Sequence, residues 1–320
     1  MSKYHHGVAI VLLSAFTSGL MPTFAKFAYN YDITVTTVLF SRFSLASVIL
    51  FGFLLITGQN IRLDKKTLLG LFFLGAVLNT LQAATYFFSL KYIPASLAVL
   101  ISYTYPAFTA IVTCLWDHEP ISRKIAFSLV STFGGLILML GTTLGEINIL
   151  GVILATGASL FYTAYIVLGN KMLKKVPPLI TCSYITLFSM VGTFVLGLFS
   201  ADKINFVFPG AAWPWLLGVV FLSLSTIVSF FKGMEILGPT KASLLCMSEP
   251  LFGVLAAMIL FHEQLTGVQF LGAAAVITGA FMAVYKPEKQ STGKDARKDA
   301  KQLWRGEVSY ATSNKSRKRG

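Results

Sequence analysis

Residues 98–119, AVLISYTYPAFTAIVTCLWDHE, and residues 242–263, ASLLCMSEPLFGVLAAMILFHE, are two versions of one segment separated by 144 positions. Both versions keep a proline, followed two positions later by a phenylalanine, and both end in His-Glu. The same offset relates further pairs: Gly7 and Gly151, Gly135 and Gly279, Phe87 and Phe231. No gap is needed between residues 7 and 284, so the chain consists of two copies of one unit.

The composition excludes a soluble globular domain. Of the 320 residues, 55% are hydrophobic and 12% are charged, against about 25% charged in typical soluble domains. The net charge of +13 would suit nucleic acid, but 11 of the 26 Lys and Arg residues lie in the last 35 positions. We therefore expect no nucleic-acid partner. Cys114, Cys182 and Cys246 each lie in an apolar run without metal-ligand spacing, which predicts core residues and no metal or cofactor.

Ten apolar runs are long enough to cross a bilayer, which takes roughly 20 helical residues. They lie at about residues 7–28, 33–57, 67–90, 94–116, 123–143, 148–169, 178–200, 212–233, 239–261 and 265–285. We expect a five-helix repeat at residues 1–144, a second at 145–286, and a basic, disordered cytoplasmic tail at 287–320. Five is an odd number, so the two copies enter the membrane in opposite orientations, as in transporters built from inverted repeats. The predicted fold class is an all-α polytopic membrane protein with ten transmembrane helices in two inverted five-helix repeats.

The distribution of Lys and Arg predicts the orientation of the chain. One side of the predicted membrane carries 22 of these residues, including both ends of the chain, and the other carries Lys26, Lys91 and Lys203. Both termini are therefore expected in the cytoplasm, with the protein in the cell (plasma or inner) membrane. The basic tail is either simply a solvated end or is attracted to anionic membrane lipid.

Several of these segments resemble the drug/metabolite transporter superfamily, and in particular its EamA type with two tandem five-helix domains. The likeness rests on Ser41-Arg42-Phe43, on the segments from Pro106 to Glu119 and from Pro250 to Glu263, and on the Gly-rich fifth and tenth spans. The resemblance implies a transporter of small organic molecules such as amino acids. It also implies frequent export and coupling to protons.

Arg42 and Glu249 are the two charged residues near the middle of a span. Arg42 lies roughly 14 Å from the outer end of the second span at 1.5 Å per residue, and Glu249 is about ten residues into the ninth. Inserting a charged side chain at this depth costs about 2.5–3.5 kcal/mol on insertion scales. A charged residue found there is therefore expected to have a partner or a function. One interpretation is a buried Arg–Glu pair, or Arg42 bound to backbone carbonyls. The other is that Arg42 holds a substrate carboxylate while Glu249 accepts protons.

Further polar and aromatic residues could line a cavity for a small zwitterion or an amphipathic metabolite. Asn79, Gln82 and Tyr86 share one face of the third span by their spacing. The other candidates are Tyr103 and Tyr105 in the fourth span, Tyr162 and Tyr165 in the sixth, and Ser225 and Ser229 in the eighth. Taken singly, each of them is more often an interhelical hydrogen-bonding residue than a ligand contact; together they suggest a cavity.

Pro106 and Pro250 occupy equivalent positions and predict helix kinks that free carbonyl groups toward a cavity, or simple bends for packing. The repeated His-Glu pairs lack the second histidine of a zinc protease. We expect Glu119 and Glu263 instead to interact with the positively charged N-termini of the helices that follow them, with Ser122 and Thr266 as N-caps.

Small residues at four-residue spacing, Ser131/Gly135 and Ala275/Gly279, occupy equivalent places in the fifth and tenth spans. They allow close helix approach, either within one chain or at the seam of a homodimer.

The leading interpretation is a secondary active transporter that exports amino acids or related metabolites by proton antiport with alternating access. An uptake permease and a flippase of lipid-linked groups are alternatives within transport. A non-transporting membrane protein is a remote alternative. The sequence carries no nucleotide-binding loop of the G-x-x-x-x-G-K type and no catalytic constellation, so we do not expect an enzyme.

Overall fold

The computed structural model describes residues 3–89, 92–93, 95–117, 122–140, 148–200, 203–261 and 266–284. The predicted tail at 287–320, both His-Glu pairs and the predicted helix-end roles of Glu119 and Glu263 lie outside the described residues. Residues Met1–Val284 belong to one unit, and the remainder of the chain to another.

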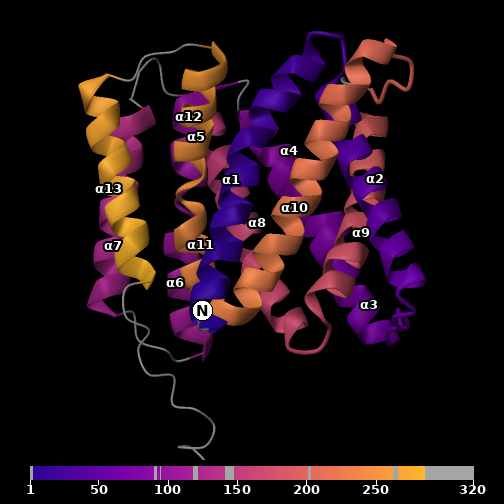
Figure 1. The fold of residues 1–320 in the computed structure, drawn as a ribbon, viewed down its shortest axis with the longest axis horizontal. Helices are drawn as coiled ribbons and strands as arrows, with labels where there is room; N and C mark the ends of the chain where they lie inside the picture. The colour runs from indigo at the N-terminus through magenta and orange to yellow at the C-terminus, as the bar shows by residue number, and fades with distance from the viewer. Residues whose placement is uncertain are drawn as a thin grey trace, which may run out of the picture. The chain divides into compact units, whose positions relative to one another are not determined.

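The described residues form helices and no strand, as predicted (Figure 1). The first repeat contains α1 (Lys3–Tyr29), α2 (Val35–Ile56), α3 (Lys65–Phe72), the π-helix η1 (Phe73–Asn79), α4 (Thr80–Ser89), α5 (Ala95–Ser102), α6 (Tyr105–Asp117) and α7 (Arg123–Leu140). The second contains α8 (Ile149–Leu173), α9 (Pro178–Phe199), the 3-10 turn η2 (Gly210–Ala212), α10 (Trp213–Leu237), α11 (Pro239–Cys246), α12 (Glu249–Phe261) and α13 (Gly267–Val284). With α3–η1–α4, α5–α6 and α11–α12 each taken as one span, these helices lie at the ten predicted positions.

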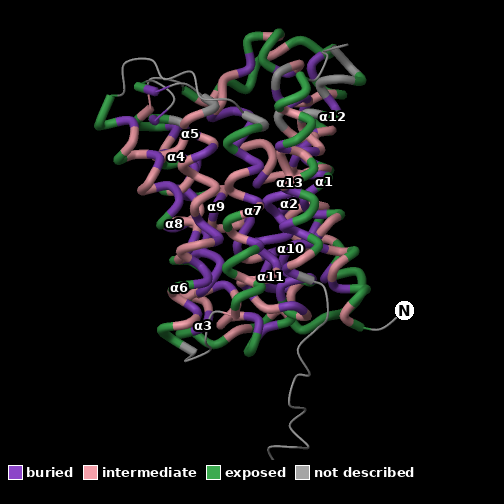
Figure 2. The backbone as a smooth tube through the Cα atoms, turned by 90° about the vertical axis from the view of Figure 1, so that its left-hand side faces the viewer, coloured by how far each residue is buried: buried purple, intermediate pink, exposed green. Residues whose placement is uncertain are grey.

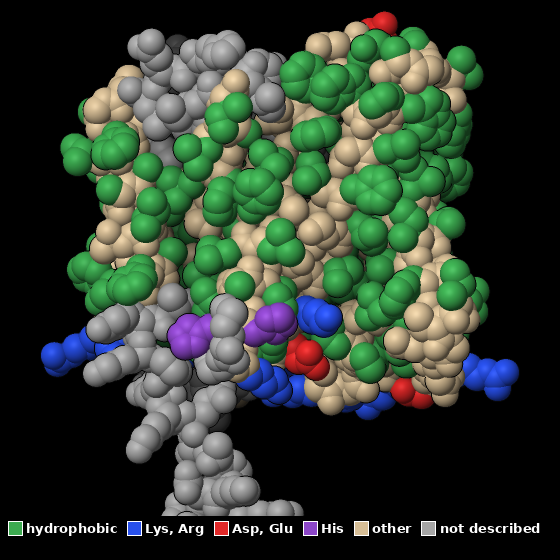
Figure 3. Space-filling model, in the orientation of Figure 1, with side chains coloured by type: hydrophobic (Ala, Val, Ile, Leu, Met, Phe, Trp, Pro, Cys, Tyr) green, Lys and Arg blue, Asp and Glu red, His purple; other side chains and the backbone are tan. Residues whose placement is uncertain are grey.

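The lengths of these helices suit a membrane protein. Seven helical segments of the described chain are long and apolar enough to cross a membrane. Outside this set are α7 and α13, of 18 residues each, and the broken pair α11–α12. Hydrophobic side chains cover the flank of the bundle in Figure 3, and buried residues run through its interior in Figure 2.

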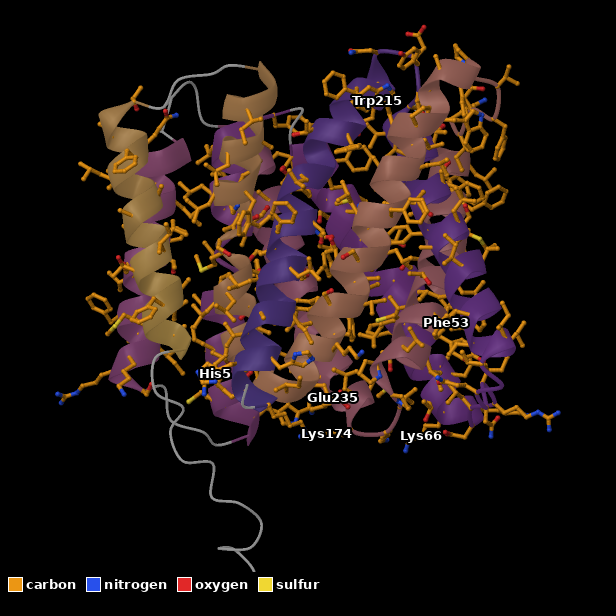
Figure 4. All side chains as sticks on the ribbon, in the orientation of Figure 1. His5, Phe53, Lys66, Lys174, Trp215 and Glu235 are labelled. Atoms are coloured by element: carbon orange, nitrogen blue, oxygen red, sulfur yellow. The ribbon has the colours of Figure 1, made fainter. Side chains whose placement is uncertain are left out.

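Equivalent helices of the two repeats run in opposite directions (Figure 4). His5, near the start of α1, and Lys174, directly after the end of α8, lie at the same end of the bundle. Lys66, at the start of α3, lies at this end too, whereas Trp215, at the start of α10, lies at the opposite end. Because α8 is the equivalent of α1, and α10 of the span that α3 begins, the repeats are inverted.

Close contacts between helices occur in equivalent pairs, in which the first and second repeats exchange roles. Gly7 of α1 packs against Ile236 of α10, where an added Cβ would lie 2.7 Å from the side chain. Gly151, the equivalent of Gly7, packs against Tyr92, the equivalent of Ile236, where an added Cβ would lie 2.8 Å away. Each contact therefore maps onto the other when residue numbers shift by 144.

Helices α7 and α13 pack against each other through the small residues predicted for close approach. Ser131 Oγ donates to the carbonyl of Ala275, its own equivalent 144 positions away, at 2.9 Å. A Cβ at Gly135 would lie 2.6 Å from the carbonyl oxygen of Gly272, and one at Gly279 would lie 2.9 Å from that of Ser128. The small residues of these two helices thus allow close approach within one chain.

The two predicted N-caps lie at the starts of these same helices. The amide of Ile125 donates to Ser122 Oγ at 3.3 Å. Thr266 Oγ1 accepts from the amide of Gln269 at 3.3 Å, and Gln269 Oε1 accepts from the amide of Thr266 at 2.9 Å. The second arrangement is a capping box. Both predicted caps are confirmed.

Candidate functional site

The fourth and ninth spans are each broken into two helices at equivalent positions. Residues 103–104 separate α5 from α6, and residues 247–248 separate α11 from α12. Pro106 and Pro250 are the second residues of the new helices. An amide in the first turn of a helix makes no intrahelical hydrogen bond, so proline loses none at this position. The structure therefore corrects the prediction of kinked continuous helices. The prolines begin new half-helices, and Glu249 is the first residue of α12.

Glu249 lies among hydroxyl groups. Ser18 of α1 and Tyr103, in the break between α5 and α6, interact with its carboxyl group as hydrogen-bond donors. Tyr86 and Tyr162 lie within electrostatic range of the same group. The start of α12 also places the carboxyl at the positive end of a helix dipole. The site is thus built to hold a carboxyl group in the middle of the bundle.

Arg42 lies on α2 and is surrounded by tyrosines rather than carboxylates. Its electrostatic partners are Tyr29, Tyr162 and Tyr165. One guanidinium nitrogen donates to Met21 Sδ at 3.5 Å, and the guanidinium carbon lies 4.4 Å from the centre of the Phe43 ring. The buried Nε atom of Arg42 has no hydrogen-bond partner among the described residues. The guanidinium group therefore keeps donors available for a ligand.

Shared neighbours place the two charges in one site. Met21, which contacts Arg42, and Ser18, which contacts Glu249, are three residues apart and so share one face of α1. Tyr162 lies close enough to both charged groups for each of them to affect its ionisation. No ion pair joins Arg42 to Glu249, both of which the structure describes and leaves partly exposed. The direct Arg–Glu pair considered from the sequence is not formed.

A row of tyrosine rings extends between the surroundings of the two charges. The ring centroids of Tyr103 and Tyr105 are 6.1 Å apart, those of Tyr105 and Tyr162 are 4.6 Å apart, and those of Tyr162 and Tyr165 are 5.9 Å apart. Tyr105 is 5% exposed and donates from its hydroxyl to the carbonyl of Ser243 at 3.3 Å. The row gives the site an aromatic wall, and its members were all predicted as candidates from the sequence.

The predicted stripe on the third span does not act as one surface, because the span contains the π-helix η1. Asn79, the last residue of η1, donates from Nδ2 to Ser189 Oγ of α9 at 2.9 Å. Ser189 Oγ donates in turn to the carbonyl of Gly75 at 3.2 Å. Asn79 is therefore engaged in a helix–helix contact, whereas Tyr86, further along in α4, lies within range of Glu249.

Three further candidates do not join the charged site directly. Gln82 and Ser225 are partly exposed, and their side chains form no hydrogen bond with another described residue. Ser225 precedes Thr226, whose hydroxyl lies 2.8 Å from Thr17 Oγ1 of α1. Ser229 is buried in α10.

Ser18, Gly19, Met21 and Tyr29 belong to the site but were not predicted. Gly19 is so close to α12 that a Cβ would lie 2.5 Å from the carbonyl oxygen of Glu249. The internal repeat could have found Ser18, because it is the equivalent of Tyr162, just as Glu249 is the equivalent of Tyr105. The Ser18–Glu249 contact is thus the counterpart of the Tyr162–Tyr105 ring pair.

Relatives of this chain are named as transporters. It is 30% identical over 285 residues to an uncharacterized transporter of Archaeoglobus fulgidus, covering 87% of this chain and 96% of that protein. It is 25% identical over 264 residues to the threonine/homoserine exporter RhtA of Escherichia coli K12, covering 79% of this chain and 83% of the exporter.

Two comparisons of the whole architecture agree with the structure. A solved crystal structure superposes with a TM-score of 0.74 at 13% identity, covering 87% of this chain and 96% of the other, which shows a shared fold. The model of the EamA-like transporter family matches residues 5–141 and 149–285, once in each repeat. These matches confirm the resemblance drawn from the sequence and identify a multi-pass membrane transporter rather than an enzyme: the chain belongs to the EamA-like transporter family.

Proposed function

We propose that this transporter exports amino acids or closely related zwitterions by proton antiport with alternating access. The observation that carries the proposal is the pair of mid-bundle charges, Arg42 and Glu249, which share Tyr162 as an electrostatic neighbour but do not form an ion pair. A zwitterion carries the two complementary charges on one small molecule. Arg42 would hold its carboxylate, and Glu249 would alternate between its proton and the substrate.

The cost of charge in a membrane explains why this exchange would be coupled. An isolated carboxylate inside the bundle is unfavourable, and either a bound proton or a bound cationic group removes that unpaired charge. The carboxyl of Glu249 has hydroxyl donors, Ser18 and Tyr103, but no basic side chain paired with it among the described residues. Proton release on one side and substrate release on the other would then complete a cycle of exchange.

The positively charged end of the bundle supports the orientation predicted from the sequence. Lys and Arg side chains gather at the end that carries the N-terminus (Figure 3). Lys66 and Lys174 are labelled at this end in Figure 4. Because cytoplasmic loops carry an excess of these residues, we assign this end to the cytoplasm and the end near Trp215 to the outside.

The experiment uses purified protein in proteoliposomes with an imposed pH gradient. Threonine and homoserine are the first substrates to test, because one relative is named as their exporter. Wild-type protein should drive labelled substrate against its concentration gradient while protons move the other way. Glu249→Gln should abolish gradient-driven accumulation while leaving the purified protein folded.

Glu235→Gln provides the matched control, since Glu235 is exposed at the basic end of α10 and lies outside the site. This variant should keep wild-type coupling. Gradient dependence that persists unchanged in Glu249→Gln would remove Glu249 from the coupling role and overturn the proposed mechanism.

A further inference from the structure

Three buried hydroxyl groups on one span have no hydrogen-bond partner among the residues that the structure describes. They belong to Ser102 at the end of α5 and to Thr109 and Thr113 of α6. Thr109 is 0% exposed and Thr113 is 7% exposed. Several other helical threonines of the described chain donate to the carbonyl four residues earlier, as Thr132 does to Ser128 at 2.6 Å. Buried polar groups nearly always form hydrogen bonds with protein or with ordered water. Because these hydroxyls have no protein partner among the described residues, we expect them to bind water.

The unpartnered hydroxyls of α6 lie on its inner face. Thr109 and Thr113 are four residues apart, and Trp116 follows three residues later on the same side of the helix. Lys171 Nζ of α8 lies 3.0 Å from the centre of the Trp116 ring. Leu115 lies on a different side of the helix and is 71% exposed. The polar face therefore leads from the helix break to a cation–π pair near the basic end.

The two-fold relation of the repeats shows what the polar face packs against. Gly253, the equivalent of Thr109, lies against Gly19 of α1, with its added Cβ 3.3 Å from the Gly19 carbonyl oxygen. The equivalent of Gly19 is Thr163 of α8, which donates to the carbonyl of Tyr105 at 3.3 Å. Thr109 is thus placed at the crossing of α6 with α8, directly beyond the tyrosine row.

The second repeat has no such polar face. Ser102, Thr109 and Thr113 correspond to Cys246, Gly253 and Ala257, none of which carries a hydroxyl. The difference has a direction, since α6 runs from the break toward the basic end and α12 runs toward the opposite end. Of these equivalent positions, only those of the first repeat carry hydroxyls, and Thr109 and Thr113 lie on the half-helix that runs from the break toward the basic end.

We propose that Ser102, Thr109 and Thr113 hold water along the α6–α8 seam and connect the Tyr105–Glu249 region to the cytoplasm, with the Lys171–Trp116 pair at its mouth. Each hydroxyl can both donate and accept, so a file of waters would satisfy all three. The assignment of this route to the cytoplasm, and its use for protons, rests on the proposed function above. The hydration of the seam itself does not depend on the identity of the substrate.

The direct test is cysteine accessibility in inside-out membrane vesicles. In a background with Cys114, Cys182 and Cys246 changed to alanine, Thr113→Cys is compared with Leu115→Cys, using a positively charged, membrane-impermeant methanethiosulfonate. A thiol reacts as its thiolate, which forms in water and not in lipid. We expect modification of Thr113→Cys to be at least about tenfold faster, and faster still when Trp116→Ala opens the mouth. Equal rates for the two variants would overturn the proposal.

A second measurement uses the shape-conserving double variant Thr109→Val/Thr113→Val. If the hydroxyls hold water, gradient-driven flux should fall several-fold, while exchange of substrate across proteoliposomes at equal pH is retained. Wild-type gradient-driven flux together with raised thermal stability would show that the seam is dry and contradict the proposal. Because thiol labelling needs neither substrate nor gradient, a wrong substrate class leaves its outcome unaffected.

Discussion

Replacing Gly19 with alanine should disturb the site through the backbone of Glu249. The new Cβ would lie 2.5 Å from the Glu249 carbonyl oxygen and 2.9 Å from Phe252 Cβ, whereas ordinary van der Waals contact begins at 3.4 Å. Helices α1 and α12 must therefore separate locally by the difference between 2.5 and 3.4 Å, about 0.9 Å. The oxygen belongs to backbone, which cannot turn aside as a flexible side chain can.

The energetic effect combines two opposing terms. Overpacking of this kind costs about 1–3 kcal/mol, and the alanine returns about 0.5–1 kcal/mol of helix propensity. We expect a net loss of about 1–2 kcal/mol in the free energy of unfolding. Misplacement of a reacting group by about 1 Å can cost on the order of 10²-fold in rate, so gradient-driven flux should fall by at least about tenfold.

The assay measures reversible unfolding in mixed detergent micelles and, separately, flux in proteoliposomes. Gly52→Ala is the matched control, because no heavy atom lies within 4 Å of its added Cβ and it makes the same change within helix α2. The control should be as stable as the wild type or slightly more so. A Gly19→Ala protein as stable and as active as Gly52→Ala would refute the reasoning.

Two further substitutions test contacts away from the charged site. Ser189→Ala removes one hydrogen bond from the side-chain amide of Asn79 and one from the backbone carbonyl of Gly75. The substitution should lower the free energy of unfolding by about 1–3 kcal/mol in the same micelle assay. Hydrogen bonds from Thr67 hold the pKa of Asp64, the N-cap of α3, below its ordinary value. The ionised cap therefore stabilises the folded protein at pH values above the ordinary pKa of Asp64. This stabilisation is lost as the pH falls through the lowered pKa. The protection factor of the Thr67 amide, which is its exchange rate relative to an unstructured peptide at the same pH, should therefore fall on acidification in wild type but not in Asp64→Ala. A wild-type protection factor that does not change with pH would disprove the role of the cap.

The positions of the helices could be predicted because the membrane imposes a length and an apolar composition on each span. The first and last residues of α2, Val35–Ile56, differ from the predicted 33–57 by one or two positions. The caps Ser122 and Thr266 were also predictable, since side-chain capping depends on neighbouring residues only. Such features are local and can be derived without knowing which helices meet.

Other features depended on packing between distant segments. The π-helix Phe73–Asn79 has no counterpart in the second repeat, where the equivalent residues belong to the continuous helix α10. Its carbonyl at Gly75 accepts from Ser189, more than 100 residues away. The broken spans at Pro106 and Pro250 likewise became two helices each rather than one kinked helix, because the chain at each break forms a separate turn.

Membrane crossing, the two inverted copies and the candidate tyrosines and charges can all be derived from the sequence alone. The meeting of Glu249 and Arg42 in one site, through Ser18 and Met21 of α1 and without a direct pair, is visible only in the folded chain. Hydropathy and periodicity are properties of single helices and carry no information about which helices meet. Whether two mid-span charges meet depends on how closely helices cross, which Gly19 sets at the contact of α1 with α12.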